Sequence, residues 1–214
     1  MLAACIPFLA LSRVPEMPRI GLRAFKFERV LEIWGAKSDR QPFHLIATYP
    51  IAAVSGTLGP KRRDGDMQAP EGFYYINRFN PHSQFHLSLG INYPNSSDRI
   101  LGDQNHLGKD IFIHGNHVSA GCLAMTDPVI DVIYRLATYA KSKGQRAIPV
   151  SIFPFRMDRA NWSKMNADNA GNPGLIAFWE TLRPAFQAFE RTHRWPRPHV
   201  DKEGHYQWPE LKTQ

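Results

Sequence analysis

The chain has 214 residues, a length that suits one domain with additional segments and a core that needs no disulfides. Its 26 lysines and arginines exceed its 19 aspartates and glutamates, so the formal net charge is +7. The basic residues are scattered, without a recognition-helix pattern or a base-stacking motif, and we therefore expect no nucleic-acid binding. No run of 18 apolar residues occurs, so we expect no transmembrane helix.

Residues 1–18 are interpreted as an apolar leader or a truncated export signal. The stretch 1–11 is apolar, but it is short and lacks a basic start. Leu2-Ala3-Ala4-Cys5 resembles a bacterial lipobox, although no hydrophobic run precedes it.

Strands are expected from runs of β-branched and aromatic residues, some of which alternate with polar residues. They are predicted at 19–24, 29–34, 43–54 (interrupted by Pro50), 73–79, 85–91, 111–114 and 148–153. Pro149 places the last of these at a sheet edge or at a strand entry. The turn-rich stretch 55–72 is either a functional loop or a solvated surface loop, and 92–109 is polar and loop-like.

Two helices are expected in the second half of the chain. Asp127 is a suitable N-cap, Pro128 suits the first helical position, and Gly144 suits the stop. A second amphipathic pattern covers 175–189, kinked or split at Pro184. Together with the strands, these helices predict a mainly β protein with helices, of the α+β class.

A histidine and a cysteine lie close together in the sequence at the end of a predicted strand. His114 ends the apolar run 111–113, and Cys122 follows a Ser-Ala-Gly turn eight residues later. If the leader is removed, Cys122 is the only thiol, because the other cysteine is Cys5. An imidazole beside a thiol can form a thiolate–imidazolium pair, which is a nucleophile for acyl transfer.

The stretch 113–126, with its His-Gly and Ser-x-Gly-Cys elements, resembles the catalytic signature of the L,D-transpeptidase (YkuD-type) family, and in particular its YafK-like branch. The stretches 55–66, 70–77 and 152–157 agree with that branch. The resemblance implies a YkuD-like β-sandwich or barrel over residues 19–190, with a helix after the nucleophile turn and C-terminal helices. Residues 191–214 would form a Pro- and aromatic-rich tail laid on the surface.

The resemblance also implies residue roles. Cys122 would be the nucleophile and His114 its base, with the Gly115 carbonyl orienting the imidazole. Backbone N–H groups near Gly121 and Cys122 would form the oxyanion hole, and Gly121 would avoid crowding the attacked carbonyl. The expected substrate-binding residues are Ser119 (alternatively a brace of the turn), His117, Asn116, Lys61, Arg62 and Arg63.

The family's substrate is peptidoglycan, and the attacked group is the L-centre carbonyl of meso-diaminopimelate in a stem peptide. Transfer to water would release a wall-anchored lipoprotein, whereas transfer to an amine would form 3–3 cross-links or attach a lipoprotein. Ala120 and Ala124 replace polar residues that many members carry, and the spacing between histidine and cysteine is short, so transpeptidation is not carried over. The resemblance implies an exported, periplasmic protein, and no cofactor or metal; whether its leader is cleaved, lipidated or truncated is left open by the sequence.

Two other classes remain open. Five histidines (82, 86, 106, 114 and 117) close to Cys122 could indicate a zinc hydrolase, although a His-Glu-x-x-His motif is absent. The second class is a non-catalytic wall-binding module that has kept the fold. The presence of both His114 and Cys122 argues against this class.

Overall fold

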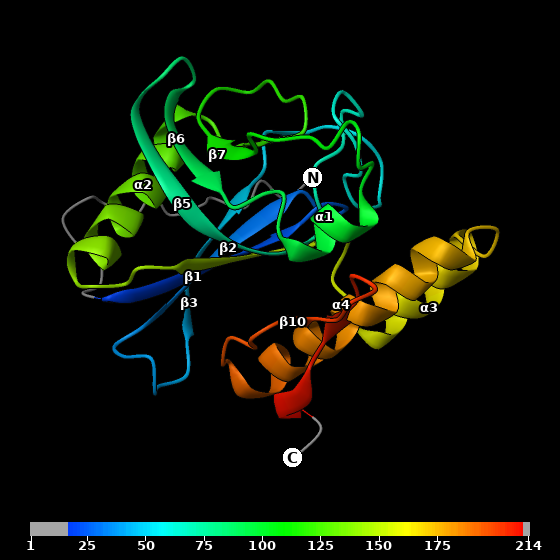
Figure 1. Ribbon diagram of the computed structural model, residues 1–214. Helices are drawn as coiled ribbons and strands as arrows, with labels where there is room; N and C mark the ends of the chain where they lie inside the picture. Colours follow the sequence, from blue (N-terminus) through cyan, green and yellow to red (C-terminus); the bar gives the residue numbers. More distant parts are fainter. Residues whose placement is uncertain (1–16, 212–214) are drawn as a thin grey trace, which may run out of the picture.

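The computed structural model describes residues 17–211, which form a mixed sheet with helices on both faces (Figure 1). The predicted α+β class is confirmed. Residues 1–16, which make up nearly all of the expected leader, lie outside the described residues. None of the helices in the described range is both long and apolar enough to cross a membrane.

The main sheet has nine strands and forms a half-barrel. In chain order these are β1 (Arg19–Phe25), β2 (Val30–Ala36), β3 (His44–Pro50), β4 (Ala53–Val54), β5 (Gly72–Ser83), β6 (His86–Ile91), β7 (Phe112–His114), β8 (Leu123–Ala124) and β9 (Ile148–Phe153). Their order across the sheet is β3-β2-β1-β9-β5-β6-β7-β8-β4. A separate hairpin joins β10 (His199–Val200) to β11 (Tyr206–Gln207).

The strand that contains Pro149 lies at the centre of the sheet, not at an edge. β9 pairs in parallel with β1 and antiparallel with β5. Pro149 is its second residue, and the described pairing with β1 begins one residue later, at Val150. Of the two placements that the sequence left open, the strand entry is therefore the one observed, since proline cannot donate to a ladder.

The helices are α1 (Ser96–Leu101), α2 (Asp127–Ser142), α3 (Arg159–Asp168) and α4 (Pro173–Thr192), with a 3₁₀ turn at Pro209–Leu211. Of the kink or split expected at Pro184, the split is wrong, because α4 runs continuously through this residue. The N-cap of α2 is Thr126 rather than Asp127. Neither α1 nor α3 was predicted. α1 is short and polar, and it is held by a capping box between Asn95 and Asp98.

The two larger hydrophobic cores occupy the two faces of the sheet. On one face, α2 packs its apolar stripe (Ile130, Ile133, Leu136) onto the strands. On the other, α3, α4 and the C-terminal segment cover aromatic residues of β1, β5 and β9. Tyr206 and Trp208, within the expected surface tail, are buried in this second core.

A buried carboxylate connects the loop 55–71 to both the sheet and α4. Glu71 is fully buried and pairs with Lys26, whose ammonium lies 2.9 Å from it. The Gly59 N–H and the Trp179 indole N–H also donate to Glu71, at 2.6 and 2.9 Å. These bonds satisfy a charge that would otherwise be costly to bury, and they fix the loop against the rest of the fold.

Candidate active site

Strand pairing places His114 and Cys122 on one face of the sheet. In the parallel pairing of β7 with β8, Ile113 lies opposite Leu123, and both side chains are buried in the core on the α2 side. Successive side chains of a strand point to opposite faces. His114 and Cys122 therefore both face away from that core, and they sit diagonally, with Cα atoms on the order of 8 Å apart at ordinary strand spacing.

The imidazole of His114 is held in one tautomer. Its Nδ1 lies 2.6 Å from the carbonyl oxygen of Gly115, which can only accept, so Nδ1 carries the proton. The lone pair is then on Nε2, as a general base requires. Phe85 covers the ring, with centroids 4.7 Å apart. A Cβ on Gly115 would lie 2.5 Å from Asp127 Oδ1 and 2.6 Å from the Phe85 carbonyl oxygen, so glycine is needed there.

The thiol of Cys122 is partly buried and contacts the entry of β7. The Phe112 N–H donates to Sγ at 3.4 Å, and Sγ lies 3.9 Å from the Asp110 carbonyl oxygen. These are the hydrogen bonds of Sγ within residues 17–211, and none of them joins it to His114. The two side chains thus share a face while the thiol is turned towards the backbone of residues 110–112.

The electrostatic surroundings favour a neutral pair over the thiolate–imidazolium pair expected from the sequence. Burial raises the pKa of the Cys122 thiol, although the Phe112 N–H and the charge of Lys61 oppose that shift. Burial also lowers the pKa of His114, against the hydrogen bond to Gly115. Both shifts disfavour the charged forms, so the proton stays on sulfur in the resting protein.

The nucleophile turn is fixed by two serines. Ser119 Oγ donates to the Cys122 carbonyl at 2.7 Å, and Ser55 Oγ accepts from the Gly121 N–H at 2.6 Å. The two hydroxyl oxygens are 3.4 Å apart. Gly121 has φ +112°, and a Cβ there would lie 3.1 Å from the Gln68 carbonyl oxygen. Backbone conformation and this carbonyl are therefore the observed reasons for the glycine.

Comparison with known proteins identifies the family of this chain. The YkuD family model, described as the L,D-transpeptidase catalytic domain, matches residues 36–152, more than half of the chain. The Escherichia coli (strain K12) protein "Putative L,D-transpeptidase YafK" is 39% identical over 177 residues, which cover 82% of this chain and 68% of that protein. This chain belongs to the L,D-transpeptidase family.

Two solved structures show a likeness of fold. The helical cell shape determining protein Pgp2 from Campylobacter jejuni is 17% identical, with a TM-score of 0.49 over 86% of this chain and 73% of that one. Bd1075 from Bdellovibrio bacteriovorus is 23% identical, with a TM-score of 0.45 over 82% of this chain and 62% of that one.

In this L,D-transpeptidase-family chain, two members of the basic cluster are engaged in ion pairs. Lys61 is buried, and its Nζ donates to Asp66 and to the Arg63 carbonyl. The Arg62 guanidinium lies 3.5 Å from Asp98. The Arg63 side chain is exposed and has no partner among the described residues. Of the three, only Arg63 presents a charge that is not already paired.

Asn116 and His117 form the turn that leaves β7. Asn116 has φ +63°, its N–H donates to Asp127 Oδ1, and its side-chain oxygen accepts from the His117 N–H. The His117 side chain is exposed. The Asn116 side chain thus has a local role in the turn, whereas the His117 imidazole is open to a ligand.

Three residues near the thiol were missed by sequence reasoning. Ser55 braces the turn from 66 residues away, Phe85 covers His114, and Asp110 contributes its carbonyl to the thiol. The only available signal was for Ser55, which begins one of the stretches that resemble the family. Phe85 and Asp110 carry no motif.

The histidines of the zinc-hydrolase alternative do not converge. Within residues 17–211, no group of three or more His, Cys, Asp or Glu side chains is arranged to hold a metal ion. His86 pairs with Asp131 and His106 with Asp103, while His114 bonds to Gly115. The arrangement is suited to a single nucleophile with a base.

Proposed function

We propose that this protein is a peptidoglycan-modifying cysteine acyltransferase or amidase in which Cys122 attacks the L-centre carbonyl of meso-diaminopimelate in a stem peptide. The observation that carries the proposal is the tautomer of His114, which leaves Nε2 free to accept a proton. His114 and Cys122 lie on the same face of the sheet. Membership of the L,D-transpeptidase family supports the choice of substrate. Because such a substrate lies in the cell wall, we propose that the protein acts in the periplasm.

In the proposed reaction, the Cys122 side chain turns from residues 110–112 towards His114, and Nε2 takes the Sγ proton as sulfur attacks the carbonyl carbon. The carbonyl oxygen gains a negative charge. We assign the Cys122 N–H as the donor that stabilises this charge, since the Gly121 N–H already donates to Ser55. The imidazolium then protonates the leaving amine, and a thioester on Cys122 remains. The Gly115 carbonyl supports the charged imidazolium at the intermediate step.

The thioester can be resolved in two ways. Water, deprotonated by Nε2, would free Cys122 and leave a carboxylate on the stem peptide, so that the amine expelled in the first step, which we propose belongs to a wall-anchored lipoprotein, stays released. An amine in place of water would give a 3–3 cross-link or an attached lipoprotein. Hydrolysis is preferred because small residues, Ala120 and Ala124, flank the cysteine where polar acceptor contacts would otherwise be available.

The decisive experiment incubates the protein with purified muropeptides and, separately, with lipoprotein-linked sacculi. Mass spectrometry then identifies the products. Released lipoprotein with a new carboxylate is the expected result, and it should disappear in Cys122→Ala and His114→Gln but persist in Cys5→Ser. Cross-linked products would instead indicate that the same residues catalyse transpeptidation.

Two outcomes would reject the mechanism. Activity that survives Cys122→Ala but is lost after treatment with a chelator would favour the zinc-hydrolase class. Sacculus binding without any product, unchanged in Cys122→Ala, would favour the wall-binding module.

A further inference from the structure

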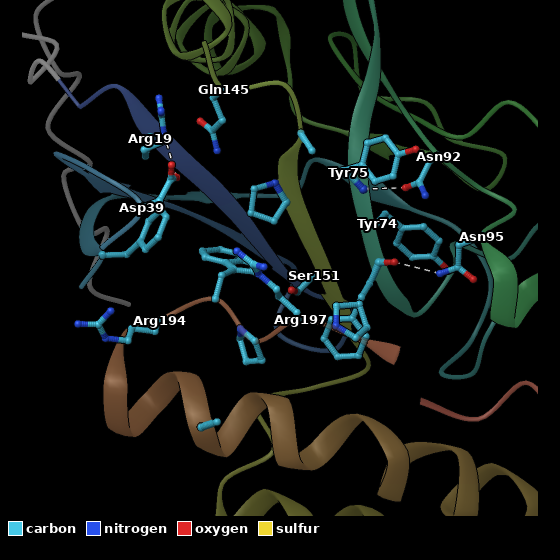
Figure 2. Close-up of a pocket in the computed structure, with 18 of the residues that line it drawn as sticks. Arg19, Asp39, Tyr74, Tyr75, Asn92, Asn95, Gln145, Ser151, Arg194 and Arg197 are labelled. Atoms are coloured by element: carbon cyan, nitrogen blue, oxygen red, sulfur yellow. Dashed lines mark hydrogen bonds and ion pairs between the residues drawn. The ribbon is translucent and has the colours of Figure 1, made fainter. Parts of the chain in front are cut away.

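A large groove lies away from Cys122, over the centre of the sheet. It has a volume of about 920 Å³, and neither His114 nor Cys122 lines it. Its floor is formed by β5 and β9 at Tyr75, Pro149 and Ser151. The segment that follows α4 forms its opposite wall (Figure 2). The volume lies in the range of pockets that bind small ligands and peptides.

The charge of this groove is strongly one-sided. Its lining includes Arg19, Arg146, Arg194 and Arg197, against a single carboxylate, Asp39. Asp39 is already paired with Arg19 at 2.8 Å. Arg146 and Arg194 are exposed, and their guanidinium groups have no partner among the described residues. The groove therefore keeps a net positive charge that an anionic ligand could neutralise.

The wall that carries Arg194 is rigid. His193 ends α4 in the left-handed conformation, and its carbonyl accepts from the Phe43 N–H at 2.7 Å. Trp195 then packs on Phe43 and Phe189, with ring centroids 5.3 and 4.8 Å away. Anchoring on both sides of Arg194 holds its backbone in place before any ligand arrives, which lowers the ordering cost of binding.

The floor and the far end of the groove offer contacts that suit a peptide. Tyr75 is 44% exposed, and its ring can pack on an extended chain. In Figure 2, Tyr75 and Asn92 lie on one side, and Arg194 lies across the groove beyond the end of α4. A ligand with carboxylates along a thin chain would fill this length, whereas a compact anion would reach only one end.

We propose that this groove is a second binding site for an extended peptide that carries closely spaced carboxylates, held by Arg146 and Arg194 and packed against Tyr75. The groove and the thiol lie on the same face of the sheet. Tyr75 points away from the face on which its neighbour Ile76 is buried, just as His114 points away from the face on which Ile113 is buried. Three strand spacings, about 14 Å, separate β5 from β8. The inference needs no turnover at Cys122.

Binding can be measured on the full chain carrying Cys122→Ala, by fluorescence anisotropy with a labelled (Glu-Gly)₅ peptide. The matched (Gln-Gly)₅ peptide tests the need for carboxylates. The double variant R146E/R194E is expected to weaken binding about tenfold or more, because charge-assisted pairs with carboxylates are lost. R135E/R159E places the same charge change on exposed arginines of α2 and α3 and is expected to change the dissociation constant less than about twofold.

Several results would overturn the proposal. The site is not this groove if both double variants weaken binding equally, or if the acidic peptide fails to bind. Carboxylates are not required for binding if (Gln-Gly)₅ binds as tightly as (Glu-Gly)₅. The site recognises negative charge and not an extended peptide if tripolyphosphate, at equal total charge, displaces the acidic peptide completely, or if Tyr75→Ser leaves peptide binding unchanged. Equal melting temperatures of the two double variants ensure that the comparison reports on binding.

Discussion

At the scale of single residues, the thiol of Cys122 and the imidazole of His114 both favour their neutral forms. Burial raises the pKa of Cys122 and lowers that of His114. These directions indicate that the thiolate forms by proton transfer during the attack and is not already present in the resting protein. The protein would then be less open to alkylation and oxidation than one with a preformed thiolate, since thiolate is the reactive form.

This difference can be measured through the pH dependence of iodoacetamide alkylation in a Cys5→Ser background. We expect the alkylation rate of Cys122 to rise through a single titration with a pKa above the ordinary thiol value of about 8.5. Cys122→Ala gives the background rate. A plateau of reactivity between about pH 5 and 7 would contradict the neutral pair, because a thiolate–imidazolium pair reacts over that range.

Ser55 is the residue whose loss should be felt most directly in the nucleophile turn. Ser55→Ala leaves the Gly121 N–H without its described acceptor, which should cost about 1–3 kcal/mol of unfolding free energy. Urea unfolding measures this loss, and the acylation rate should fall as the turn loosens. Ser142→Ala, which removes an exposed hydroxyl at the end of α2, is the control. Equal effects of the two substitutions would show that Ser55 does not hold the turn.

At the scale of elements, α1 carries a titratable group in its first turn. Burial raises the pKa of Asp98 to about 6, although the Asn95 N–H, the Tyr74 hydroxyl and the charge of Arg62 pull the other way. An unfolded aspartate titrates near 3.9, so the folded protein keeps a proton that the unfolded chain releases. This contribution to stability is complete below about pH 4 and is lost as the pH rises through about 6.

Asp98→Asn removes the titration while keeping the oxygen that accepts at the capping box. Relative to wild type, its unfolding free energy should rise by roughly 2 kcal/mol between pH 4 and pH 7, because a pKa difference of one unit is equivalent to about 1.4 kcal/mol. Urea unfolding at several pH values measures the difference. Asp168→Asn, on the exposed surface of α3, is the control substitution. Parallel pH curves for wild type and Asp98→Asn would refute the raised pKa.

The elements differ in how far the sequence could predict them. Strands and the long amphipathic helices are visible because their apolar residues recur at fixed periods, as in α2 and β6. α1 and α3 have no such pattern: one is stabilised by local caps and the other has a single buried residue, Met165. The Nδ1 contact of His114 with the Gly115 carbonyl joins two adjacent residues of one motif, whereas the Ser55 brace depends on a long-range contact that no local pattern encodes.

At the scale of the whole molecule, the C-terminal segment is part of the second core. The Trp208 ring lies 4.8 Å from Phe73, and its indole N–H donates to the Thr181 carbonyl at 2.8 Å. Tyr206 reaches the Phe73 N–H and the Asn95 amide. This segment therefore joins α4 to β5 and α1, and it should be needed for stability.

Trp208→Ala should cost about 3–5 kcal/mol of unfolding free energy, as large-to-small substitutions in packed cores do. Trp162→Ala, at a partly exposed position on α3, should cost clearly less. Denaturant unfolding monitored by circular dichroism compares the two. A loss below about 1 kcal/mol for Trp208→Ala would show that the segment is peripheral.

The central position of β9 has a consequence for synthesis on the ribosome. Among the described strands, β1 and β5 are joined only through β9, which begins at Ile148, so a nascent chain that ends before this residue holds two part-sheets with unpaired backbone at their inner borders. Stalled or truncated chains that end before β9 should be bound by chaperones and degraded by proteases more readily than the complete chain. The strands that present His114 and Cys122 can join the complete sheet only after that stage has passed.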